Sequence, residues 1–157
     1  MKTIRFFLAA LTLSATSLIA SAQTTPALTA YYGVKDALVA TDAAKAKTGA
    51  TALVTALSKV DAAKLSANDK KALATAKTKA TAISKTNDVD TQRAAFEGLS
   101  TSMIALAKAT KPAKAYVQFC PMAAEGKGAS WLSDKREVRN PYYGDKMLKC
   151  GSVKEEI

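Results

Sequence analysis

Two cysteines and two methionines form mirrored pairs near the C-terminal end of the sequence. Cys120 and Met122 are two residues apart, and Met147 precedes Cys150 by three residues. In an extended segment, side chains two residues apart point to the same side, and in a helical turn residues three apart share a face. Each pair can therefore present one thiol and one thioether together.

Thiolates and thioethers are soft ligands, which select monovalent copper or silver over hard cations. The sequence contains no histidine, so it lacks the imidazole ligand that zinc and divalent copper sites commonly use. A zinc site would need additional carboxylates, and the acidic residues of this segment show no zinc spacing. The pattern predicts a Cu(I) or Ag(I) site formed by Cys120, Met122, Met147 and Cys150.

The same cysteines also fit a structural alternative. In an oxidising compartment, two cysteines commonly form one disulfide. A Cys120–Cys150 bond would enclose 29 residues, and it would contribute about 3–4 kcal/mol by restricting the unfolded chain. A disulfide has no need of neighbouring methionines, whereas a soft-metal site uses them. Both interpretations stay open from the residues alone.

Aromatic residues accompany the cysteines. Trp131, Tyr142 and Tyr143 are candidates to cover the site, to fill a small satellite core or to form a partner-binding patch. The glycine-rich stretch 125–128 lacks the length and the Lys-Ser/Thr ending of a phosphate loop, and a turn is the favoured interpretation. Residues 140–144, which contain Asn-Pro, indicate a second turn.

The residue types argue against an enzyme. The sequence has no histidine base, no nucleophile with an evident partner and no carboxylate pair set apart from the solvated charges. A thiol redox catalyst usually brings its cysteines close together in sequence, whereas Cys120 and Cys150 are far apart. We therefore expect a protein without catalytic activity.

The N-terminal residues predict a cleaved signal peptide over residues 1–22. Lys2 and Arg5 precede a mostly apolar run, and Ala20-Ser21-Ala22 has the small-x-small pattern of a cleavage site. The run is short and no second apolar segment follows it, which argues against a transmembrane anchor. The expected product begins at Gln23 and is periplasmic or secreted.

The charge of the predicted mature chain is basic. Removal of the signal lowers the formal net charge from +10 to +8, because Lys2 and Arg5 are lost. The remaining lysines are spread along helical segments with almost no aromatic residues between them. This distribution favours a solvated helix face, and we expect no nucleic-acid partner.

The middle of the chain is predicted to be helical. No proline occurs between Pro26 and Pro112. Ser66, followed by an acidic residue three positions later, and Asn87 or Asp88 are candidate N-caps. Apolar residues recur at helical spacing in four stretches, at 28–38, 46–60, 73–83 and 96–106. The break near Thr41 and Asp42 has no glycine or proline, so one long bent helix over 27–60 stays an alternative.

The predicted fold is mainly α, a four-helix up-and-down bundle over residues 23–112. Residues 113–157 form an irregular C-terminal segment packed on it, and the two parts make a single domain over 23–157. Within that segment Tyr116–Cys120 has the pattern of a short strand, and residues 145–151 favour one helical turn.

Two motifs carry a family resemblance: CPMAAEGKGASWLS at residues 120–133 and EVRNPYYGDKMLKCGSVKEEI at residues 137–157. They resemble a domain of unknown function found in small exported bacterial proteins. The same domain occurs at the C-terminus of periplasmic adaptor subunits of Cus-type copper/silver efflux systems of the resistance-nodulation-division class. The family pattern is matched directly at Cys120, Met122, Met147 and Cys150. Some relatives carry histidine where this chain has Phe119; if that histidine is a ligand in them, the resemblance implies a weaker or a purely sulfur-based site here.

The resemblance implies a helical domain in a heavy-metal context. This chain lacks the hairpin and barrel of a full adaptor, so we expect a free-standing module that buffers or carries Cu(I) or Ag(I), with an efflux adaptor as candidate partner. The alternative is a non-catalytic structural or protein-interaction module closed by the Cys120–Cys150 disulfide.

Overall fold

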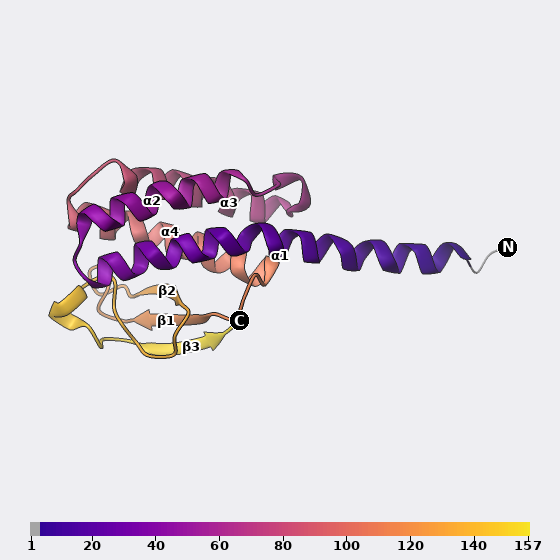
Figure 1. Ribbon diagram of the computed structural model, residues 1–157. Coiled ribbons are helices and arrows are strands. Elements are labelled where there is room, and N and C mark those ends of the chain that lie inside the picture. The colour runs from indigo at the N-terminus through magenta and orange to yellow at the C-terminus, as the bar shows by residue number, and fades with distance from the viewer. Residues whose placement is uncertain (1–3) are drawn as a thin grey trace.

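The computed structural model describes residues 4–157, with side chains described from residue 22 onward. Over that range the chain forms four α-helices, followed by a small sheet (Figure 1). The helices are α1 Ile4–Val39, α2 Ala43–Ser58, α3 Ala67–Ser84 and α4 Val89–Thr110, with a short 3-10 turn, η1, at Ala62–Lys64. Helices adjacent in sequence pack together, and α4 also packs on α1. The prediction of a mainly α fold with a four-helix bundle is confirmed.

The predicted signal peptide falls largely on residues whose side chains are not described, and residues 1–3 lie outside the described chain altogether. The backbone of residues 4–22 belongs to α1. No helix among the described residues is both long enough and apolar enough to cross a bilayer.

Local capping explains where the helices begin. The Asp42 carboxylate accepts from the backbone N–H of Lys45 at the start of α2, and Asp88 caps α4 in the same way. Ser66 caps α3, as predicted. Such oxygens pair N–H groups that have no partner within the helix. Thr41 has a left-handed φ of 56°, so α1 and α2 are separate helices.

The core of the bundle is built from alternating small and branched side chains. Ala46 and Ala50 of α2 are fully buried, and so are Ala76 and Ala80 of α3. Small residues at a helix contact let the axes approach closely. Met103 belongs to this core, so it packs as a hydrophobic residue there.

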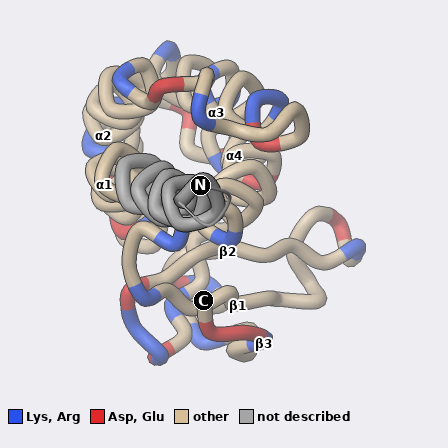
Figure 2. Tube along the Cα trace, turned by 90° about the vertical axis from the view of Figure 1, so that its right-hand side faces the viewer, with Lys and Arg blue, Asp and Glu red and all other residues tan. Residues whose placement is uncertain are grey.

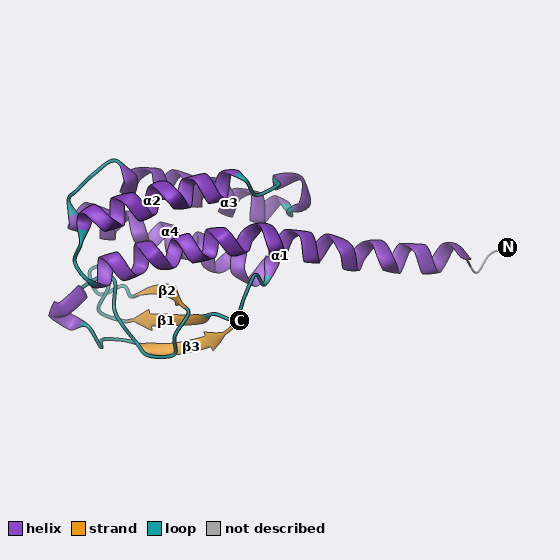
Figure 3. Ribbon diagram, viewed as in Figure 1, coloured by secondary structure: helices purple, strands orange, loops and turns teal. Residues whose placement is uncertain are grey.

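The C-terminal segment contains more regular structure than expected. The predicted strand appears with the same bounds, as β1 Tyr116–Cys120, and it pairs on both sides. The antiparallel sheet has the order β2-β1-β3, with β2 Ala129–Ser133 and β3 Ser152–Glu156. The helical turn predicted over residues 145–151 is shorter than expected: it is a 3-10 helix, η2 Gly144–Met147, which ends before Cys150. Figure 3 shows the strands and their loops together on one side of the helices.

A row of aromatic rings fixes the sheet to the bundle. Tyr31 of α1 stacks on Phe96 of α4, with ring centroids 5.3 Å apart. Phe96 meets Tyr142 edge to face at 5.7 Å, and Tyr142 meets Trp131 of β2 at 5.9 Å. The Tyr31 hydroxyl also accepts from the backbone N–H of Leu132 at 3.2 Å. The row continues from the bundle to the sheet without a gap.

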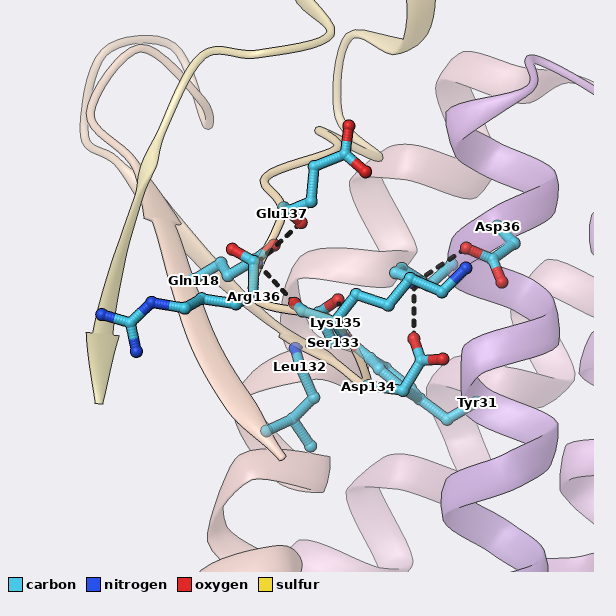
Figure 4. A network of polar contacts seen from close by, with 10 residues as sticks. Tyr31, Asp36, Gln118, Leu132, Ser133, Asp134, Lys135, Arg136 and Glu137 are labelled. Atoms are coloured by element: carbon cyan, nitrogen blue, oxygen red, sulfur yellow. Dashed lines mark hydrogen bonds and ion pairs between the residues drawn. The ribbon is translucent and has the colours of Figure 1, made fainter. Parts of the chain in front are cut away.

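The loop after β2 is held from two sides (Figure 4). The amide of Gln118, a buried residue of β1, donates to the backbone oxygens of the three consecutive residues 135–137. From α1, the buried Lys35 ammonium pairs with Asp36 at 2.8 Å and with Asp134 at 3.3 Å. The loop therefore bridges the sheet and the bundle.

Basic residues are spread over the outside of the molecule. In the view along the bundle, lysines lie along α2 and α3, on the far side from the sheet, and further basic residues lie on the loops of the C-terminal segment (Figure 2). All lysines of α2 and α3 are exposed or half-buried. Their positions agree with the expected solvated helix face.

Candidate functional site

The two thiols meet at one end of the sheet. Cys120 is the last residue of β1, and Cys150 lies just before β3, which pairs with β1. Their Sγ atoms are 2.6 Å apart, and both cysteines are free. Cys120 is fully buried, whereas Cys150 is partly exposed. The fold thus brings together two thiols that are 30 residues apart.

A glycine lets the second cysteine approach the first. Gly151 has a φ of 139°, a backbone conformation that favours glycine. A Cβ at this position would lie 2.8 Å from the Phe119 carbonyl oxygen and 3.0 Å from the Trp131 ring. Because a side chain would not fit, glycine is what allows the chain beside Cys150 to lie directly against β1.

Asn140 fixes the backbone that carries Cys150. Its side chain is fully buried, and its Nδ2 donates to the Cys150 carbonyl oxygen at 2.9 Å. Its Oδ1 accepts from the Tyr142 N–H at 2.8 Å, and its own N–H donates to the Leu148 oxygen at 2.8 Å. The Asn-Pro pair predicts the turn but not this role of the asparagine side chain. The signal that could have found it is the asparagine side chain, which commonly bonds backbone within turns.

We expect Asn140→Ala to destabilise the protein by about 2–3 kcal/mol, because it leaves the partly buried Cys150 carbonyl and Tyr142 N–H without their partner. Urea unfolding followed by circular dichroism measures the effect. Asn87→Ala, at an exposed position before the Asp88 cap, is the control and should change the free energy of unfolding by less than about 0.5 kcal/mol. Equal effects of the two substitutions would contradict the role given to Asn140.

The two methionines lie at the surface, close in sequence to the cysteines. Among the described side chains they are the exposed large hydrophobic ones, with Met122 53% and Met147 37% exposed. The Met147 carbonyl accepts from the Cys150 N–H at 3.0 Å, and the Met122 carbonyl accepts from the Tyr143 hydroxyl. Each thioether therefore belongs to a backbone turn that is tied to the site.

The Cys150 thiol holds its proton more tightly than an ordinary cysteine, because its pKa is raised. The pKa of Cys150 is raised, first by its hydrogen bond with Cys120, then by burial and by the charge of Cys120. A hydrogen bond from the Met122 backbone opposes this shift. Any metal bound by the pair must displace these protons, because thiolate is the ligand form.

The three aromatic candidates have different surroundings. Trp131 is fully buried and packs against Tyr142; it belongs to the same hydrophobic core as the helical bundle, not to a separate satellite core. Tyr142 donates from its hydroxyl to the Ser130 carbonyl at 2.7 Å. Tyr143 is half-buried and anchors the loop of Met122. Tyr142 and Tyr143 also line a cleft of about 400 Å³ between α4 and the loop after β1.

Nitrogen and oxygen ligands do not converge at this place. Within the described part of the chain, no group of three or more histidine, cysteine, aspartate or glutamate residues could hold a metal ion together. The sulfur atoms that meet at this end of the sheet are the two thiols of Cys120 and Cys150.

Comparison with known proteins gives one result. A family model described as protein of unknown function (DUF3347) matches residues 27–115, more than half of the chain. The matched range covers the helical bundle and ends just before β1, so the two thiols lie beyond it. Neither the curated proteins nor the solved structures gave a match.

Proposed function

We propose that this chain, which belongs to the family described as protein of unknown function (DUF3347), is an exported protein that binds Cu(I) or Ag(I) as cargo. One observation carries the proposal: the Sγ atoms of Cys120 and Cys150 are 2.6 Å apart, and the backbones of both exposed methionines bond to Cys150, at its N–H for Met147 and at its sulfur for Met122. Such a set of soft ligands suits a soft monovalent ion.

The site needs a small adjustment to hold a metal. Two sulfur atoms bound at about 2.3 Å to one tetrahedral ion lie roughly 3.8 Å apart, whereas the thiols here are 2.6 Å apart. Cys120 is fixed at the end of a strand and buried, but Cys150 is partly exposed on a loop. A rotation of the Cys150 side chain would therefore open the space.

Surface thioethers favour a carrier or a buffer over permanent storage. Thioethers bind weakly, so Met122 and Met147 at the rim can be exchanged for ligands of a partner. This fits delivery of the metal to an efflux adaptor subunit, the partner that the resemblance of the sequence motifs implies. The donor set is suited to binding, and we propose no catalytic step.

The contacts near the N-terminus support export. The Gln23 side chain accepts from the Asp61 N–H at 3.0 Å, so the bundle uses the residue at which the mature chain is predicted to begin. A chain cleaved after Ala22 would begin its first helix near Thr25 and Pro26. Proline suits the first position of a helix, because the N–H that it lacks has no partner there in any case. A periplasmic or secreted protein is consistent with these contacts.

The test is competition for Cu(I) with a chromophoric chelator, under anaerobic and reducing conditions, using protein purified from the periplasm. We expect one Cu(I) per chain and a loss of affinity of at least about 100-fold in Cys120→Ser, since a thiolate ligand disappears. The double variant Met122→Leu with Met147→Leu should bind roughly tenfold more weakly, with little change in stability.

Met103→Leu is the matched control, because Met103 is buried in the bundle core and should leave Cu(I) affinity unchanged. The proposal fails if the two surface methionines can be replaced without effect and Cys120→Ser still retains copper. In that case the contact between the sulfur atoms favours the second candidate, a non-catalytic module closed by a Cys120–Cys150 disulfide, which would be about two daltons lighter than the dithiol form.

A further inference from the structure

The two thiols of the pair differ in their access to solvent. Cys120 is 0% exposed, at the end of the central strand and paired across the sheet with Ala129. Cys150 lies on the loop before β3 and is partly exposed. An external reagent therefore reaches the sulfur of Cys150 first. The Cys120 sulfur lies beneath it, 2.6 Å away.

We infer that this pair undergoes thiol–disulfide exchange with an external disulfide, with Cys150 as the attacking thiol and Cys120 as the resolving thiol. Resting on the proposed function, the exchange would also act as a gate, because the oxidised pair offers no thiolate to a soft metal. The Cys120–Cys150 disulfide and the metal-binding dithiol are then the oxidised and reduced states of one site.

The exchange balances in two steps. Cys150 first loses its proton, and its thiolate attacks one sulfur of the external disulfide; that S–S bond breaks, and the external thiolate that leaves takes up a proton. Cys120 Sγ then attacks Cys150 Sγ in the mixed disulfide, and the second external thiol leaves with the proton of Cys120. The protein loses two electrons and two protons, and the external disulfide becomes two thiols.

The fold favours the second step over escape of the mixed disulfide. Resolution requires the two sulfur atoms to meet, and they are 2.6 Å apart before any reaction. Asn140 holds the backbone carbonyl of Cys150, and the close approach at Gly151 keeps this segment against β1. With two cysteines in the sequence, a single intramolecular product is available.

The experiment uses reduced, metal-free protein and oxidised glutathione as the probe, with acid-quenched samples analysed by intact mass. Cys120→Ser should accumulate one glutathione adduct per chain. Cys150→Ser, whose remaining thiol is buried, should react at least about tenfold more slowly. The unsubstituted protein should finish about two daltons light with no lasting adduct. Circular dichroism of both serine variants checks that each is folded.

Equal adduct rates in the two serine variants would overturn the assigned roles. A lasting adduct on the unsubstituted protein, or no reaction at all, would overturn the exchange itself. Copper retention is measured on the reduced protein with no external disulfide present, so its result is independent of the exchange experiment. A protein that exchanges but does not retain copper would refute the proposed function alone, and a protein that retains copper but does not exchange would refute this inference alone.

Discussion

Replacing Trp131 with alanine is expected to destabilise the protein by about 3–5 kcal/mol, the usual cost of removing a large buried aromatic side chain. The ring is fully buried, it packs edge to face with Tyr142 at 5.9 Å, and it lies against the backbone at Gly151. Its removal leaves a cavity between β2, the turn at Tyr142 and the segment of Cys150. The sheet then loses the ring that joins it to Tyr142 and the aromatic row.

Trp131→Phe separates packing from hydrogen bonding. The indole N–H has no hydrogen-bond partner among the described residues, so phenylalanine retains much of the packing and removes no bond. We expect it to cost clearly less than alanine, about 1–2 kcal/mol. Urea unfolding followed by circular dichroism gives both values. Similar losses in the two variants would show that ring packing is not the main contribution of this residue.

The second large effect is expected at Arg93, where Arg93→Met should cost about 3 kcal/mol. The guanidinium of this nearly buried residue donates to the Pro141 carbonyl at 3.0 Å and to the Leu38 carbonyl at 3.1 Å. It also donates to the Thr41 hydroxyl. Methionine fills a similar volume but leaves buried acceptors unpaired, at about 1–3 kcal/mol each.

Two further variants make the Arg93 experiment specific. Arg93→Lys keeps the charge but presents a single nitrogen, which does not span these separate acceptors, so we expect an intermediate loss. Arg136→Met alters an exposed side chain and should change stability by less than about 0.5 kcal/mol. The free energy of unfolding in urea distinguishes the three. If Arg93→Met matched Arg136→Met, the bonds described for Arg93 would contribute nothing to stability.

Elements with local signals could be predicted from the sequence. The buried stripe that includes Leu53 and Leu57 follows helical spacing, and Ser66 followed by Asp69 gives a recognisable cap. Tyr116–Cys120 alternates in the way a strand does, and its bounds were found without error. The contact between the thiols agrees with either sequence interpretation, since a disulfide and a shared metal both require proximity.

Elements defined by partners distant in sequence could not be predicted. β3 reads Ser-Val-Lys-Glu-Glu and is mostly exposed, so it has no apolar alternation, and its structure depends on the backbone bonds to β1. Arg93 and Gln118 look like ordinary surface residues until their acceptors, 48 to 55 and 17 to 19 residues away, are known. Tertiary contact decides such positions, and propensity does not.

The break between the first two helices illustrates the same limit. Thr41 is neither glycine nor proline, yet it takes a left-handed φ of 56°, at a cost of about 1–2 kcal/mol for such a residue. Its hydroxyl accepts from Arg93, and Gly144 lies so close that a Cβ there would be 2.5 Å from that hydroxyl. The turn is stabilised by contacts that no local pattern contains.

The strand order β2-β1-β3 sets an order of events during folding. A short loop joins β1 and β2, and each helix packs on its neighbour in sequence. We expect these local contacts to form early. The pairing of β1 with β3 closes a loop of about thirty residues and, with its higher loop entropy, is expected to form late. The two thiols therefore meet late in folding. Oxidation before that point would favour dimers linked between chains, and a chain that has already folded would be protected from this error.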